Sequence, residues 1–272
     1  MGAKGFGLGA MKVDDQSLDA IRREMDEIDD AILGLLVRRV AASGRVKGQK
    51  SQSGTLSSSP IRPAREAAIL RRLTRRGGTS VPPELLVRLW RVILSASTLA
   101  QAPVSLHISR KLSSNMALRL KLRDQFGPMP AEEYPDEGEA LAQLNANGGD
   151  ICAIETGSPW ADAYAAGAAG GARIIASLPV LREEPVPELL IFGHAEALAT
   201  GDDETVLVSD GKLPRDFLPA PLWQVKSGER WVTCLPGFLP EHEGPLVGLI
   251  RSNPGLGLKI AGRYPSPIEI KP

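Results

Sequence analysis

Two basic residues in the first part of the chain have the type and spacing needed to bind a small anion. Arg39 and Lys50 are eleven residues apart, which is three helical turns, so on a helix they share one face about 16 Å apart by rise. Their long side chains can converge on a single anion that lies between them.

Further polar candidates follow these two cations along the chain. Arg65 and Glu66 are consecutive at the start of a second helical segment, where the helix dipole also favours an anion. Ser97 and Gln101 are four residues apart in a third helical segment and therefore face the same way. The pocket implied by these residues is cationic, with one carboxylate and two neutral hydrogen-bonding groups.

Arg22 lies too far along the chain to join this pocket from the same subunit. It precedes Arg39 by 17 residues, which is about 25 Å along one straight helix. No small metabolite bridges that distance. If Arg22 serves a site, the site must therefore belong to a partner chain.

A long helix is needed to carry the first three of these residues. From Ser17 to about Lys50, apolar residues recur at steps of three and four, which is a heptad seam typical of packing between helices. This helix is about 50 Å long, so it cannot cover its seam within a small domain, and we expect it to pack against a second copy. The seam consists of Leu18, Ile21, Met25, Ile28, Ile32 and Leu35.

Two shorter helices complete an all-α region. We expect the second to begin at Pro63 and to end at the Gly77–Gly78 pair, because proline suits a first helical turn and glycine a helix end. The third should begin at the Pro82–Pro83 pair and run to about Gln101, with Pro103 as its stop.

After Pro103 the pattern changes to alternating helices and short apolar runs, which is typical of an α/β domain. We therefore predict a multidomain chain, with a disordered extension at 1–13, a three-helix all-α domain at 14–102 and an α/β domain at 103–272. The expected helices are Asn115–Phe126 and Glu137–Asn147, and the expected strands are Val104–Ile108, Ile151–Ile154, Ala172–Ile175, Leu189–Phe192, Thr205–Val208, Trp231–Cys234 and Leu258–Ala261.

The charge balance argues against nucleic acid or membrane as a partner. The chain has 32 Lys and Arg residues against 32 Asp and Glu residues, so no overall field attracts polyanions. No run approaches the ~20 apolar residues of a membrane span. No secretory signal is visible at the start, so we expect a cytoplasmic protein.

We interpret four further arginines of the second helix as a solvated face: Arg71, Arg72, Arg75 and Arg76.

The sequence contains no pattern that indicates a metal or a cofactor. Cys152 and Cys234 fit no metal spacing and are expected to be buried free thiols. The glycine-rich stretch at 167–172 follows no strand, so it is not a dinucleotide-binding loop. The three histidines are scattered, and we expect structural roles for them: His107, His194 and His242.

The helical region resembles the AroQ family of chorismate mutases. The resemblance covers Ser17–Gln101 and rests on three stretches, IRREMDEIDDAILGLLVRRVAASGRVKGQK, PIRPAREAAILRRL and LSASTLAQ. It implies an intertwined helical homodimer that isomerises chorismate to prephenate without a cofactor. Each of its two sites would be completed by one arginine from the other subunit.

The resemblance also implies which residues hold the two carboxylates of chorismate. By matching positions, Arg22 is the arginine supplied by the partner, and it would bind the carboxylates together with Arg39. Arg65 and Ser97 would be supporting contacts to the same groups.

Three more residues match the groups that act on the rest of the substrate. Lys50 and Gln101 would bind the ether oxygen, and Glu66 would bind the ring hydroxyl. We therefore expect these three residues and Arg39 to be the catalytic groups. Family members often place an Asp a few residues before the Arg-Glu pair, whereas this chain has Arg62–Ala64 there, so one hydroxyl contact is expected to be missing.

The reaction explains why the helical region contains no His or Cys. A Claisen rearrangement needs a flexible dianion held in its compact conformer, and it needs stabilisation of the negative charge that grows on the ether oxygen. Fixed cations and hydrogen-bond donors provide both. No nucleophile, metal or proton relay is required.

The α/β region faintly resembles prephenate dehydratase, which is often fused to mutases of this type. The resemblance rests on Asp150–Tyr164 and on the strands that follow it. The diagnostic Thr-Arg-Phe is absent where the chain has Glu204–Leu207, and SLHISRKLSS replaces the Gly-Pro-x-Gly-Thr motif. We therefore expect a degenerate dehydratase-like or regulatory domain without dehydratase activity.

Three functions remain open at this point. The predicted one is a chorismate mutase of aromatic amino-acid biosynthesis. The alternatives are a bifunctional chorismate mutase and prephenate dehydratase, and a non-catalytic regulatory protein of the aromatic pathway.

Overall fold

A computed structural model describes residues 18–52, 59–214 and 216–269, with the side chains of 46–52 left out. The extension expected at residues 1–13 lies outside the described residues. The chain divides into two units, Met1–Gln49 and Lys50–Pro272.

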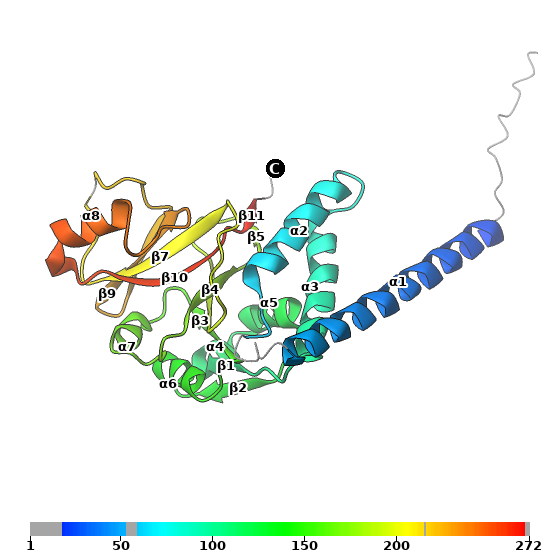
Figure 1. Cartoon of the computed structure of the whole chain (residues 1–272), viewed down its shortest axis with the longest axis horizontal. Coiled ribbons are helices and arrows are strands. Elements are labelled where there is room, and N and C mark those ends of the chain that lie inside the picture. Colours follow the sequence, from blue (N-terminus) through cyan, green and yellow to red (C-terminus); the bar gives the residue numbers. More distant parts are fainter. Residues whose placement is uncertain (1–17, 53–58, 215, 270–272) are drawn as a thin grey trace, which may run out of the picture. The chain divides into compact units, whose positions relative to one another are not determined.

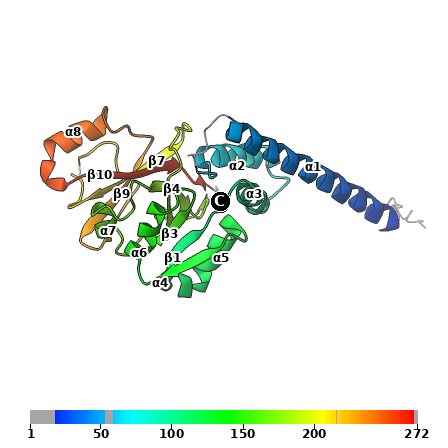
Figure 2. The ribbon, with the colours of Figure 1, turned by 60° about the horizontal axis from the view of Figure 1, so that its bottom comes forward.

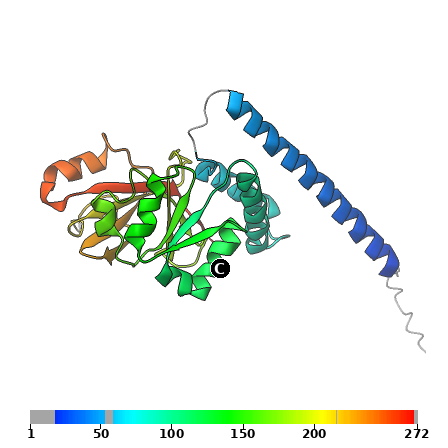
Figure 3. The same ribbon diagram turned by 90° about the horizontal axis from the view of Figure 1, so that it is seen from below.

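The first unit is built on one long helix, α1 (Leu18–Gln52), which runs without a break (Figure 3). It has nearly the predicted bounds. The six seam residues expose between 41% and 62% of their surface. An amphipathic helix that exposes its apolar face in this way has a surface suited to burial against another element.

The second unit begins with a pair of packed helices, α2 (Pro63–Gly77) and α3 (Pro83–Leu99) (Figure 2). Both have proline at the first turn, as predicted. Helix α2 is followed by Gly78, whose φ of 52° is easy for glycine and strained for other residues. The structure thus confirms both expected helices, although α3 ends two residues before Gln101.

A nine-stranded mixed sheet forms the centre of this unit, in the order β2-β1-β3-β6-β4-β10-β7-β9-β8. Strand β1 is parallel to β2 and β3, β4 is parallel to β10, and the other neighbours are antiparallel. The strands are β1 (Leu106–Ser109), β2 (Ala131–Tyr134), β3 (Ile151–Glu155), β4 (Arg173–Leu178), β6 (Leu189–Gly193), β7 (Asp203–Ser209), β8 (Trp223–Ser227), β9 (Arg230–Pro236) and β10 (Lys259–Pro265). A separate parallel pair is formed by β5 (Leu181–Arg182) and β11 (Ile268–Glu269).

The sheet is buried on both faces because its central strands are apolar on both. Along β3, Ile151 and Ala153 enter one hydrophobic cluster, whereas Cys152 and Ile154 enter another. This alternation is the period of two that a strand imposes. Two covering layers are therefore required, and Figure 1 shows helices on either side of the sheet.

Helices from different parts of the chain supply the two layers. On one face lies α5 (Met116–Phe126), with Leu118 and Leu122 in the cluster that contains Ile151. On the other face lie α6 (Glu137–Ala142) and α7 (Ala161–Ala165), with Trp160 fully buried between them and the strands. The remaining helices are α4 (Arg110–Ser114), α8 (Pro245–Ser252) and the 3-10 turns η1 (Gln143–Asn145) and η2 (Pro254–Leu256).

The α2–α3 pair packs on the α/β region within this second unit. Helix α3 contacts α5, and α2 contacts β10. Leu70, Val87 and Leu94 are among the residues buried on the two helices, with exposed fractions of at most 7%. The α2–α3 pair and the α/β region are therefore joined by a packed interface as well as by the chain.

One expected helix is wrong in length. The helix predicted at Glu137–Asn147 ends at Ala142 and continues only as the turn η1. The Asn145 side chain donates hydrogen bonds to the carbonyls of Ala142 and Ala168. An asparagine that satisfies backbone carbonyls in this way competes with helix continuation.

Although α1 is long, neither it nor any other described helix has the apolar stretch needed to cross a membrane.

Gly262 in β10 lies so close to β4 that no side chain fits. A Cβ atom at this position would overlap the backbone of Ile174. We expect Gly262→Ala to lower the free energy of unfolding by about 1–3 kcal/mol, the usual cost of overpacking a tight site. Urea denaturation of the full chain measures this change.

Gly248 in α8 provides the matched control, because a Cβ there meets nothing within 4 Å. Gly248→Ala should leave stability unchanged or raise it by up to about 1 kcal/mol through helix propensity. Equal stabilities of the two variants would contradict the close pairing of β10 with β4.

The two cysteines are buried free thiols, as predicted. Burial raises the pKa of both, since it disfavours the thiolate. Because the thiolate is the reactive form, neither Cys152 nor Cys234 should react with an aromatic disulfide reagent at pH 8 in the native protein. Both should react after denaturation in urea, and a fast-reacting thiol in the folded chain would contradict the burial.

Candidate active site

The first candidate cations lie along α1. Arg22 is exposed and forms an ion pair with Asp19 at 3.2 Å. Arg39 is half-buried, and desolvation lowers the pKa of its guanidinium. Since both residues lie on one unbroken helix, their 17-residue separation still corresponds to about 25 Å. Lys50 also lies in α1, but its side chain is outside the described part.

Arg65 and Glu66 are neighbours in α2 but occupy different environments. Arg65 is exposed, whereas Glu66 shares a helix face with the buried Leu70, four residues further on. The carboxylate Oε2 of Glu66 accepts a hydrogen bond from Nη1 of Arg91 at 2.6 Å, and the two side chains are only 14% and 8% exposed. This is a largely desolvated ion pair between α2 and α3.

Ser97 and Gln101 lie together at the end of α3. The Ser97 hydroxyl donates to the carbonyl of Ile93 at 2.8 Å, and Gln101 Nε2 donates to the carbonyl of Ser97 at 3.0 Å. Both residues are half-buried. Gln101 lies in the turn that follows the helix, yet its amide keeps the expected proximity to Ser97.

The second unit contains a hollow of about 620 Å³, including the space open at its mouth, between α2, α3 and the sheet. Glu66 and Arg91 lie in its wall, and the rest of the lining is mainly apolar, with Leu70, Phe126 and Ile191 among its residues. Arg65, Ser97 and Gln101 do not line it. This hollow is therefore not the cationic pocket that the sequence predicts.

The structure thus assembles the predicted residues in groups. Within the second unit it places Ser97 beside Gln101, and it pairs Glu66 with a residue that the sequence reasoning did not single out. Arg22 and Arg39 belong to the first unit.

Arg91 is the functional candidate that sequence reasoning missed. It occupies the apolar face of α3, together with Val87, Leu94 and Thr98, where an arginine requires a nearby acid. Glu66 and Glu84 are the two acids between Arg62 and Arg91. Arg91 is four residues after Val87 and three before Leu94, so it falls on the apolar face of α3. This spacing is the signal that could have identified the pair of Arg91 and Glu66.

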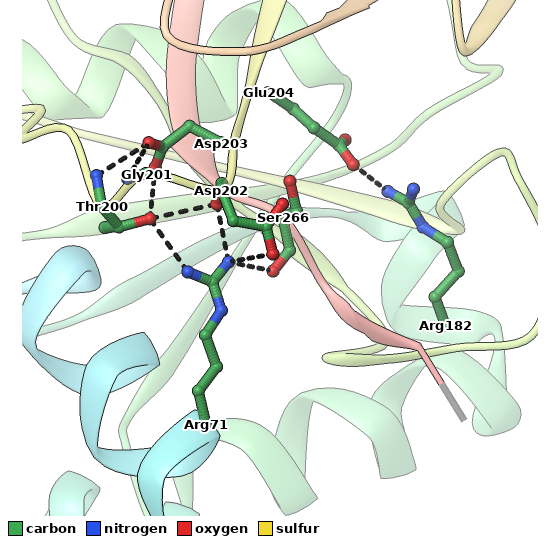
Figure 4. A network of polar contacts seen from close by, with 8 residues as sticks. All are labelled: Arg71, Arg182, Thr200, Gly201, Asp202, Asp203, Glu204 and Ser266. Carbon is green, nitrogen blue, oxygen red and sulfur yellow. Dashed lines mark hydrogen bonds and ion pairs between the residues drawn. The ribbon is translucent and has the colours of Figure 1, made fainter. Parts of the chain in front are cut away.

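The interpretation of Arg71 as part of a solvated face is wrong. Its side chain is only 17% exposed and forms an ion pair with Asp202 at 3.3 Å. Its guanidinium also donates to Thr200 Oγ1 and to the carbonyls of Asp202 and Ser266 at 2.7–2.9 Å (Figure 4). Arg71 therefore points toward the ends of β7 and β10 rather than into solvent. The other three arginines are exposed as expected: Arg72, Arg75 and Arg76.

Two of the three histidines have polar partners within the fold. His107 is 4% exposed, and its Nε2 lies 3.2 Å from Asp150 Oδ2. His194 Nε2 lies 3.0 Å from the carbonyl of Leu144. Among the described residues, no cluster of three or more His, Cys, Asp or Glu side chains is suited to hold a metal ion.

The side chains at the start of the segment Glu204–Leu207 have structural contacts. Glu204 is 1% exposed and is bound by Arg182 (Figure 4). The Thr205 hydroxyl donates to the carbonyl of Gly237 at 2.7 Å. Both side chains therefore stabilise strand ends.

Comparison with known protein families identifies the helical region. Residues 21–102 match the family of chorismate mutase type II. The matched segment includes all seven candidate site residues: Arg22, Arg39, Lys50, Arg65, Glu66, Ser97 and Gln101. No curated protein and no solved structure matches the chain. The chain thus contains a chorismate mutase type II domain, which indicates an isomerase, followed by a strand-rich α/β region.

Proposed function

We propose that this protein is a chorismate mutase that converts chorismate to prephenate in aromatic amino-acid biosynthesis, in the cytoplasm. The observation that carries the proposal is the family match of residues 21–102, a segment that includes all seven candidate site residues. We assign the mutase domain to residues 14–102 and the α/β domain to 103–272.

In the proposed mechanism one carbon–oxygen bond breaks while one carbon–carbon bond forms, and no proton is transferred. Arg39 and the partner's arginine hold the two carboxylates, so that the substrate stays in its compact conformer. Lys50 and Gln101 donate hydrogen bonds to the ether oxygen, where negative charge develops in the transition state. Donors fixed before the reaction stabilise this charge without reorganisation.

Glu66 binds the ring hydroxyl in this proposal. Its ion pair with Arg91 supports the assignment, because an ionised carboxylate accepts hydrogen bonds with both of its oxygens. The Asp that family members often supply nearby is replaced by Arg62–Ala64. Glu66 is then the carboxylate that remains for this contact.

We propose a homodimer in which two α1 helices cover each other's apolar seams. The exposure of the six seam residues supports this arrangement, because burying them removes a continuous apolar stripe from water. The separation of Arg22 from Arg39 along α1 supports it independently. Arg22 then completes the site of the other subunit.

The test is incubation of the full-length protein with chorismate. Chorismate should disappear and prephenate should appear, with no phenylpyruvate absorbance before acid treatment. Phenylpyruvate formation would favour the bifunctional mutase and dehydratase, which the structural contacts of Glu204 and Thr205 disfavour. Turnover no faster than the uncatalysed reaction would favour the non-catalytic regulatory protein.

Replacing either central cation should reduce turnover strongly. Arg39→Ala and Lys50→Ala should each lower kcat/KM for chorismate by ~100-fold or more, if each supplies about 2.7 kcal/mol of transition-state stabilisation. Arg72→Ala is the control, because Arg72 is exposed on α2, and it should remain within about twofold of wild type. A loss below about threefold at both Arg39 and Lys50 would mean that the site is misassigned.

The shared site should be recoverable by mixing two inactive variants. In a heterodimer of Arg22→Ala and Arg39→Ala subunits, one site has both arginines and the other has neither. Free exchange of subunits in a two-fold dimer should therefore restore about a quarter of the wild-type sites. No recovery after verified exchange would contradict a site that is shared between subunits.

A further inference from the structure

A buried arginine lies in the middle of α3. Arg91 is 7% exposed and occupies the same helix face as Val87 and Leu94. Burial of a guanidinium is unfavourable unless its charge and its donors are satisfied. The groups that satisfy Arg91 therefore define what this residue does.

One of those groups is the carboxylate proposed to bind the substrate. Arg91 Nη1 lies 2.6 Å from Glu66 Oε2, and solvent has little access to either side chain. A charge-assisted hydrogen bond in such surroundings is short, strong and weakly screened. Arg91 consequently fixes the position of one oxygen of Glu66.

The other group belongs to the α/β region. Arg91 Nε donates to the carbonyl of Gln125 at 3.3 Å, and the hydroxyl of Ser95 donates to the carbonyl of Phe126. Gln125 and Phe126 are the last two residues of α5, where helix carbonyls have no partner within the helix. A cation at this end of α5 is also favoured by the helix dipole.

A second arginine holds α2 to the same region. Arg71, five residues after Glu66, is hydrogen-bonded to Thr200, Asp202 and Ser266 at the ends of β7 and β10 (Figure 4). The helix that carries Glu66 is thus fixed to the sheet by Arg71 and to α3 by Arg91.

We propose that Arg91 is a positioning residue of the mutase site and that the α/β region supports the site through it. Arg91 binds Glu66 Oε2, which leaves the second carboxylate oxygen for the ring hydroxyl of the substrate. The C-terminus of α5 in turn holds Arg91. The proposal rests on the proposed function, because it assigns the hydroxyl contact to Glu66.

Arg88 offers a matched control on the same helix. It lies three residues before Arg91 and forms an ion pair with Asp124 of α5 at 2.7 Å, but the two side chains are 69% and 53% exposed. An exposed pair of this kind contributes little to stability. Arg88→Ala therefore removes an arginine that links α3 to α5 without affecting Glu66.

The experiment measures kcat and KM for chorismate in the full-length protein. Arg91→Ala should lower kcat/KM by roughly tenfold or more, the usual effect of removing one partner of a buried charge-assisted hydrogen bond. Most of the loss should appear in KM, because the hydroxyl contact is present in the ground state as well as in the transition state. Arg91→Lys should recover part of the loss, and Arg88→Ala should stay within twofold of wild type.

A double-mutant cycle separates positioning from a general loss of stability. In a Glu66→Ala background, Arg91→Ala should have almost no further effect on kcat/KM, because the group that it positions is gone. Equal losses in the two backgrounds, or no loss in either, would overturn the proposal. Urea denaturation of each variant identifies any that fails to fold, and Arg91→Lys, which keeps the charge, then takes its place in the cycle.

A binding measurement keeps this proposal distinct from the proposed function. Calorimetric titration with a dicarboxylate transition-state analogue should show weaker binding for Arg91→Ala and for Glu66→Ala, by similar factors. If wild type binds the analogue and both variants bind it more weakly, but wild type does not turn over chorismate, the proposed function fails while the positioning of Glu66 by Arg91 is supported. If wild type does not bind the analogue, both fail.

Discussion

The central strands β3, β6 and β4 are apolar on both faces, and the second unit is organised by the need to cover both. Helices α6 and α7 cover one face. The other face is covered by α5. Ile61, just before α2, and Leu99, the last residue of α3, also belong to this layer. Part of a segment that matches a mutase family therefore belongs to the core of the α/β region. The polar contacts of Arg71 and Arg91 lie within this apolar interface.

This arrangement distinguishes two kinds of surface in the mutase segment. Helices α2 and α3 turn one face to the α/β region, where Leu70, Val87 and Arg91 are buried. Helix α1 has an exposed apolar seam along much of its length. Arg65, which is exposed, and Glu66, which is paired with Arg91, are adjacent residues on the boundary between these environments. The carboxylate has a rigid setting, whereas its neighbouring cation stays accessible to an anion.

The helices of the mutase segment could be predicted closely because their signals are local. Proline at the first turn and glycine at the end mark α2, and the heptad steps mark α1. The longer strands, such as β3 and β7, could be predicted because strands that are buried on both faces contain short continuous apolar runs. Strand β2 was not predicted, since its residues AEEY are mostly exposed and polar. Helix α7 was missed because five residues are too few to show a helical period.

The candidate site shows the same division between local and distant contacts. Ser97 and Gln101 were paired correctly, since they are four residues apart. Arg71 was misjudged because its partners Thr200 and Ser266 lie 129 and 195 residues further along the chain. Periodicity shows that a residue faces inward, but it does not identify the distant group that the residue meets. For Arg91 even the inward face was visible, and only its partner Glu66 required the folded structure.

The contact between Arg71 and Ser266 has a consequence for biosynthesis. The Ser266 carbonyl that accepts a hydrogen bond from Arg71 of α2 is synthesised 195 residues after Arg71 itself. Domains that emerge first usually fold first, whereas here the mutase helices cannot complete their docking until β10 has joined the sheet. Until then the apolar faces of the nascent helices α2 and α3 are not yet covered by the α/β region.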